Sequence, residues 1–402
     1  MSSTGFSHND YELRSQSDAY VAVMSVYENE SLLIDKMGIN QLSKLIDEYA
    51  SDGCQTLRIE DFKGKRLAID VSNYMYQFAY NPQGKKPNYH IAGFFHLVYE
   101  LACAQIMPVM VLDGNPNTHK KEHVLVQRKA ELERKKHRIT ELTDSIKHID
   151  VNTADTAALA KVAQVAGQVV QQNKQIINVT AEMWNETIAL FDLMGVPVMR
   201  AEGEADVLAA QLTKTGHVAG IISEDMDHLI FGGRVLIRDF NNKRDPDLTV
   251  YNYERILQSS GLTADQLIQV AILCGCDYTE KISGIAWKTA FKLIRDEKET
   301  IDSIIRKIDE GAKGFTKYTV PDSFLYKEAQ ELFKSTDASY DERALKPTAF
   351  KADELKRMLM SKCNYRDTTL TPKFDAIRRL LAQHAQTNDA VMSFPKPTMK
   401  TV

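Results

Sequence analysis

The sequence has no stretch of about 18 uncharged apolar residues, which argues against a transmembrane helix. Its first 30 residues are polar and acidic and lack an apolar secretory core, so we expect a protein that is not secreted. Cysteine is scarce: the five residues are scattered, their number is odd, and no pair of CxxC motifs occurs. We therefore expect reduced thiols in a nuclear protein, or a cytoplasmic one if the chain is viral.

An excess of positive charge is also missing, because the 402 residues carry a formal net charge of −4. Residues 1–36 account for this whole value, so the remaining 366 residues are neutral on balance. If several acids of that part share one site, the rest of its surface is basic. The net charge therefore does not exclude a partner that carries phosphates.

Residues 196–232 read as a strand, a helix and a second strand, which is the pattern of a parallel α/β unit. Glu202 and Glu204 follow the first strand, and Asp225 and Asp227 follow the second. Open parallel sheets carry their sites beyond the carboxyl ends of strands, and residues two apart in an extended segment share a side. Carboxylates that converge in this way repel one another, and Mg²⁺ or Mn²⁺ would offset that cost. The alternative is a solvated loop with scattered acids.

Three further acids fit the same pattern. Asp70 ends a buried strand at residues 67–71, and Asp113 follows another at residues 109–112. A predicted helix over residues 261–279 presents Asp277 near its carboxyl end, and the Cys274–Cys276 pair within it is interpreted as core. The prediction is thus a site of seven acids in an α/β fold.

A basic segment at residues 118–138 predicts a long exposed helix, on which Lys121 and Arg128 lie two turns apart on one face. It is either a solvated surface or an arm that contacts phosphates. A glycine turn between helices at residues 282–290 would also let backbone amides approach phosphates.

Together these segments resemble the flap endonuclease family of structure-specific 5′ nucleases. The likeness runs from Met37 to about Leu381 and is carried by MGINQLSKLI, LAIDVSNYMYQF, VMVLDGNP, AEGEADVLAAQL, SEDMDHLIFG and ILCGCDYTEKISGI. All seven acids match the family motifs. The resemblance implies a twisted, mostly parallel sheet flanked by helices, with a helical arch over the site and a helix–two-turn–helix element that binds duplex DNA.

The resemblance also implies hydrolysis of DNA phosphodiesters with two Mg²⁺ ions per site, or Mn²⁺ in their place. Asp113, Glu202 and Glu204 would hold one ion, with Asp70 acting through water. Asp225 and Asp227 would hold the second, with Asp277 acting through water. The residues that it implies for contact with DNA or its scissile phosphate are Gly38, Tyr76, Lys120, Lys121, Arg128, Glu202, Gly275, Asp277 and Lys288, where Lys120 is the alternative to Lys121.

The chain departs from the family pattern in four places. Ala286 and Trp287 replace a glycine and a proline of the helix–two-turn–helix element. Binding of K⁺ by the backbone carbonyls there requires Ala286 to avoid positive φ, so the sequence does not decide whether the K⁺ site is kept. Gln83 and Leu97 replace arginines that contact DNA. The tail AVMSFPKPTMKTV has no clamp-binding peptide, so recruitment by a sliding clamp is not expected. Relatives start at the position of Met37, so either translation begins there or residues 1–36 form a disordered or autoinhibitory arm.

We therefore expect an acidic extension (1–36), a nuclease core (37–385) and a polar tail (386–402). Within the core we expect an N-terminal nuclease region (37–138), the arch (118–180), an internal nuclease region (181–300) and C-terminal helices (301–385). The predicted function is a monomeric 5′ flap endonuclease with 5′-to-3′ exonuclease activity in DNA replication and repair. The alternatives are a related nuclease acting on bubbles, recombination intermediates or RNA, and a non-catalytic binder of DNA junctions.

Overall fold

The computed structural model describes residues 31–32, 39, 41–79, 88–114, 133–134, 136–147, 161–166, 168–169, 177–240, 247–335 and 338–385. Its centre is a seven-stranded sheet in the order β2-β9-β8-β7-β3-β4-β6. The strands from β8 to β6 are parallel, while β9 and β2 join antiparallel at one side, so the predicted mostly parallel sheet is confirmed. Their bounds are β2 Cys54–Arg58, β3 Arg66–Asp70, β4 Met107–Leu112, β6 Val198–Arg200, β7 Gly220–Ile222, β8 Val235–Arg238 and β9 Asp247–Asn252.

Alternate residues of the central strands face two separate hydrophobic cores, as the pleat of a strand requires. In β4, Val109 and Val111 pack into one core, whereas Met110 and Leu112 pack into the other. All six residues of this strand are buried. A continuous apolar run of this kind is expected where helices cover both faces of a parallel sheet.

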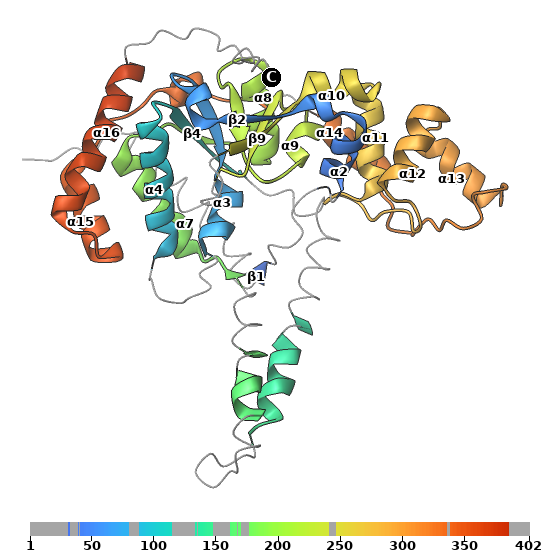
Figure 1. Cartoon of the computed structure of the whole chain (residues 1–402), viewed down its shortest axis with the longest axis horizontal. Coiled ribbons are helices and arrows are strands. Elements are labelled where there is room, and N and C mark those ends of the chain that lie inside the picture. Colours follow the sequence, from blue (N-terminus) through green and yellow to red (C-terminus); the bar gives the residue numbers. More distant parts are fainter. Residues whose placement is uncertain are drawn as a thin grey trace, which may run out of the picture.

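Two groups of helices cover the two faces, and Figure 1 shows α4, α7, α15 and α16 on the side opposite α10 to α14. The first face carries α2 Leu42–Tyr49, α8 Ala205–Lys214, α9 Asp227–Ile230, α10 Tyr253–Ser260, α11 Ala264–Cys274, α12 Trp287–Phe291, α13 Ile301–Asp309 and α14 Tyr326–Lys334. The second carries α3 Val71–Ala79, α4 Tyr89–Cys103, α7 Ala181–Met194, α15 Ala352–Cys363 and α16 Asp367–Ala385.

The helix predicted at residues 261–279 is shorter at both ends. Thr263 caps α11 and exchanges hydrogen bonds with Gln266, which places the first turn after Gly261. Gly275 ends the helix with φ of 98°, a conformation that favours glycine. Asp277 therefore lies in the turn beyond the helix, next to a short bridge between Cys276 and Thr279.

Several predicted features lie partly or wholly outside the described residues, among them Gly38, Lys120, Lys121 and Arg128. Within the arch segment, residues 136–144 and 161–166 are helical, as predicted. Of the acidic extension, β1 (Ser31–Leu32) is described, and it pairs antiparallel with β5 (Ile177–Asn178) at the end of the arch segment.

The structure bears on two features of the sequence, its apolar runs and its cysteines. Among the described residues, no helix combines the length and apolar character needed to cross a membrane. All five cysteines are described and are free thiols, and Cys274 and Cys276 are buried in the core.

Candidate active site

The candidate site lies at the carboxyl edge of four neighbouring parallel strands, β7, β3, β4 and β6. The chain order passes from β3 to β4 and β6 on one side and then to β7 on the other, so the direction of winding reverses between β3 and β7. Ligands of open α/β sheets bind at this reversal point. Asp70 ends β3, and the other strand-end acids follow β4, β6 and β7.

Asp70 joins the ends of β3 and β7. The residue is 5% exposed, and its Oδ1 accepts the amide of Asn73 at 3.1 Å, a bond that caps α3. Its Oδ2 accepts the hydroxyl of Ser223 at 2.8 Å. The same hydroxyl oxygen accepts the amide of Asp225 at 3.1 Å. One serine thus connects the predicted ligands at the two central strands.

Asp113 and Glu204 join β4 to the amino terminus of α8. Oδ1 of Asp113 accepts the amide of Ala205 at 2.8 Å, at the positive end of this helix, and Oδ2 accepts the hydroxyl of Ser72. Glu204 is the residue before α8 and is buried, and its Oε2 accepts the hydroxyl of Tyr278. Because Tyr278 follows Asp277, this bond ties the turn after α11 to the same edge.

The expected pairing of acids along extended segments is wrong, because residues 202–203 form a bend, and a bend at Glu224 and a turn at Met226 lead into α9, which begins at Asp227. Oδ1 of Asp225 accepts the amide of Asp227 at 2.9 Å, an Asx turn that leads into α9. Oδ1 of Asp227 accepts the amide of Ile39 at 2.8 Å. Glu202 is exposed whereas Glu204 is buried. Turns and a helix start therefore bring these acids to one edge.

The electrostatics show that negative charge accumulates at this edge. Burial raises the pKa of Asp225, and the charges of Asp277 and Asp70 raise it further against the opposing effect of His228. Asp70, Glu204, Asp225 and Asp227 are each at most 9% exposed. Buried carboxylates that repel one another are unfavourable unless a cation or a donor offsets them.

His228 and Asp206 are part of this arrangement although the sequence analysis did not single them out. The His228 side chain is fully buried, and its Nε2 lies 3.2 Å from Oδ1 of Asp206 and 3.3 Å from Oδ2 of Asp70. Burial would lower the pKa of His228, but the two carboxylates raise it to about 9. Burial would likewise raise the pKa of Asp70, but the imidazolium lowers it. The signal was available, since both residues lie inside the acidic motifs EGEAD and EDMDH.

The residues present fit divalent cations. Carboxylate oxygens are the hard ligands that Mg²⁺ and Mn²⁺ prefer. The surrounding serine, tyrosine and amide donors hold the carboxylates as partners of metal ligands commonly do. The ligand atoms of Asp70, Asp206 and His228 lie within 4.8 Å of one another and could hold a metal ion if His228 lost its proton.

The described candidates for DNA contact are placed as follows. Tyr76 lies half-buried on α3, the helix that begins directly after Asp70. Gly284 has φ of 87°, while Ala286 has φ of −109°, so alanine is accommodated without strain in this turn. Lys288 is exposed, but its Nζ pairs with Glu48 at 2.7 Å. That pair must open before Lys288 can reach a phosphate.

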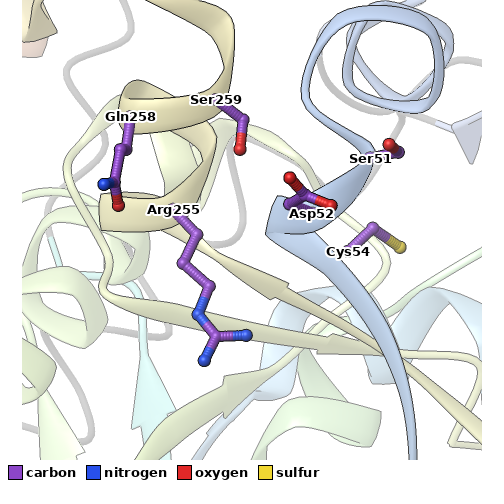
Figure 2. A pocket seen from close by; sticks show the side chains of 6 residues that line it. All are labelled: Ser51, Asp52, Cys54, Arg255, Gln258 and Ser259. Carbon is purple, nitrogen blue, oxygen red and sulfur yellow. The ribbon is translucent and has the colours of Figure 1, made fainter.

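A polar cavity of about 630 Å³ lies elsewhere, between α10 and the short helix η3 (Ser51–Gly53). Figure 2 shows Arg255 and Gln258 on α10 opposite Asp52 and Cys54. None of the seven acids lines this cavity. Its mixed charges show no convergence on one ligand chemistry, so we assign the site to the acidic edge.

Comparison with known proteins gives concordant matches. Residues 37–136 match the XPG N-terminal domain, and residues 195–277 match the XPG I-region. Flap endonuclease 1-A of Sorghum bicolor is 31% identical over 378 residues, covering 91% of this chain and 92% of the relative. Among solved structures, flap endonuclease-1 from Methanococcus jannaschii superimposes with a TM-score of 0.58 at 20% identity, covering 86% of this chain and 99% of that one. The catalytic core of Rad2 in complex with a DNA substrate gives a TM-score of 0.60 at 21% identity, covering 87% and 100%.

Proposed function

The chain belongs to the flap endonuclease family of the 5′ nucleases, and on that premise we propose that it cuts branched DNA at the base of a 5′ flap using two Mg²⁺ ions. One observation carries the proposal. Four adjacent parallel strands are followed by acids at a single edge, where Ser223 links the Asp70 carboxylate to the amide of Asp225 and the Asp113 carboxylate accepts the amide of Ala205. The relatives named as flap endonucleases and a neighbour solved with a DNA substrate support this choice of substrate.

We assign the metal ligands by position along this edge. Asp113, Glu202 and Glu204 lie at the ends of β4 and β6 and would hold one ion, while Asp225 and Asp227 would hold the other. Asp70 ends β3, which lies between β7 and β4, and would act on the first ion through water, while Asp277 would act on the second through water. When bound, such ions lower the pKa of a water molecule and stabilise the leaving oxygen of a phosphodiester.

The protein itself fixes the carboxylates before substrate arrives. Ser72, Ser223 and Tyr278 donate to them, and the imidazolium of His228 holds Asp70 and Asp206 in the interior. Because these donors belong to buried elements of the sheet and its helices, the ligand geometry needs little reorganisation during the reaction.

We propose that the DNA contacts come from the arch and from the helix–two-turn–helix element. Lys121 and Arg128 of the arch would neutralise the scissile phosphate, and Tyr76 would stack on a nucleotide beside it. Lys288 would reach duplex phosphate after leaving Glu48. Affinity for DNA should then fall steeply with salt.

The test is cleavage-site mapping on labelled 5′-flap, nicked, gapped, bubble and RNA-flap duplexes, with Mg²⁺, with Mn²⁺ and without metal. We expect metal-dependent incision at the flap junction in preference to the other substrates. Equal attack on RNA or bubbles would favour a related 5′ nuclease. Tight binding to flaps with no incision under any metal would favour a junction binder and overturn the proposal.

A further inference from the structure

Glu202 differs from the other acids in how it is held. It is exposed and lies in a bend beside Gly203. Among the described residues, its carboxylate has one hydrogen-bond partner, the hydroxyl of Ser339, which donates to Oε1 at 2.5 Å. The two residues are 137 positions apart in sequence. Asp70, Asp113 and Glu204 are instead held by residues in or close to the strands and helices of the carboxyl edge.

Ser339 belongs to a strap, residues 338–351, that connects α14 on one face of the sheet with α15 on the other. The strap runs past β6, which is the edge strand. The amide of Thr348 donates to the carbonyl of Gly195 at 3.0 Å, and the amide of Lys351 donates to that of Leu193 at 2.9 Å. These two bonds tie the strap to the end of α7, just before β6.

The strap is anchored next to Ser339. The hydroxyl of Tyr340 lies 3.0 Å from Oγ1 of Thr215 and 3.1 Å from Nδ1 of His217, and its ring packs edge-on against that imidazole. Leu345 is buried in the core of the first face. These contacts fix the strap relative to the end of β6. The position of the Ser339 hydroxyl is therefore set by contacts other than its bond to Glu202.

We propose that Ser339 is a positioning residue that orients the Glu202 carboxylate as a ligand of the divalent metal. The inference rests on the proposed function, because it requires Glu202 to bind metal. In the free protein an exposed glutamate samples many rotamers, and ordering it costs side-chain entropy. The Ser339 hydroxyl selects one rotamer beforehand, so metal binding avoids that cost. The strap thereby makes a C-terminal segment part of the metal site.

The experiment measures metal binding without turnover. Metal-free full-length protein is titrated with Mn²⁺ in the absence of DNA, and free Mn²⁺ is followed by its paramagnetic resonance signal. Ser339→Ala should weaken Mn²⁺ affinity about tenfold, near the lower end for partners of metal ligands because the pair is exposed. Ser339→Thr keeps the hydroxyl and should stay close to wild type. Ser361→Ala is the matched control, because that exposed serine donates to its own helix at Met358.

Two further measurements test whether Ser339 acts on metal binding through Glu202: a double-mutant comparison and the Mg²⁺ dependence of the cleavage rate. In a Glu202→Gln background, Ser339→Ala should cause no further loss of Mn²⁺ affinity. In flap cleavage, Ser339→Ala should raise the Mg²⁺ concentration at half-maximal rate about tenfold and leave the rate at saturating Mg²⁺ within about twofold.

Wild-type Mn²⁺ affinity in Ser339→Ala would overturn the inference, and so would an equal loss in the Glu202→Gln background. A wild-type protein that neither binds Mn²⁺ nor cuts flaps would instead overturn the proposed function, and the inference with it. If Ser339→Ala lowers the melting temperature, Ser339→Thr decides: a folded Thr variant with weakened affinity contradicts the role of the hydroxyl.

Discussion

Gly114→Ala should push apart the ends of β4 and β6, which carry the ligands that we assign to one metal ion. Gly114 follows Asp113, and its amide donates to the carbonyl of Gly203 at 2.8 Å. A Cβ atom at this position would lie 2.0 Å from the carbonyl oxygen of Ala201 and 2.7 Å from that of Glu202. Both obstacles are backbone atoms, which cannot rotate away. Since Cβ contacts below 3.0 Å essentially never occur, the ends of β4 and β6 must move apart by about 1 Å.

The expected cost can be stated for both activity and stability. A displacement of about 1 Å between catalytic groups costs on the order of 100-fold in rate. Overpacking of this kind costs about 1–3 kcal/mol in the free energy of unfolding. The assay is kcat/KM on a 5′-flap duplex at saturating Mg²⁺, together with urea unfolding.

Gly203→Ala is the matched control. It changes the hydrogen-bonded neighbour of Gly114, yet a Cβ at Gly203 would meet no atom within 4 Å and the residue has no positive φ. We expect this variant to stay within about threefold of wild type, since surface substitutions are usually near neutral. If Gly114→Ala cleaves as fast as Gly203→Ala, the close approach of β4 and β6 does not govern the site, and the reasoning is refuted.

Three further predictions follow from single residues. Asp225→Ala should abolish cleavage yet retain flap binding in a gel-shift assay, because phosphate contacts lie elsewhere; retained turnover would contradict its role as a ligand. Asp206→Ala should lower the free energy of unfolding by up to about 3 kcal/mol, because it removes one of two carboxylates from a buried imidazolium, and urea unfolding measures this. Burial, and to a lesser extent the charge of Arg66, lower the pKa of His384 in the folded protein. In the unfolded chain this pKa is about 6.5, so as the pH falls below 6.5 the unfolded chain binds a proton that the folded protein does not yet bind. Stability should therefore fall as pH drops below about 6.5, by at most about 1.4 kcal/mol per pH unit, and His384→Met should flatten that slope in urea unfolding at pH 7 and pH 5.5.

Much of the fold could be predicted from the sequence, because the governing signals are local. The apolar runs around Ala68 and Val111 predict buried strands, and the acids that follow them are visible in the printed order of residues. The antiparallel strands β2 and β9 were missed. They lie at one side of the sheet, and β2 is only partly buried, so its residues lack a clear apolar run.

The candidate site could likewise be predicted in part. Which acids gather could be inferred, because parallel strands place their carboxyl ends at one edge whatever the loops between them. How each acid is held could not: Tyr278 on Glu204, Ser223 on Asp70 and Ser339 on Glu202 join segments that are far apart along the chain.

The sequence by itself determined the alternation of strands and helices, the seven acids and the family to which they belong. Hydrophobic period and strand-end position depend on neighbours within a few residues, so they can be read without a structure. The tertiary structure alone decided that turns bring the acids together, that His228 carries a proton between two carboxylates, and that the strap reaches Glu202. Those facts depend on strand order and on the packing of distant segments, which no local pattern encodes.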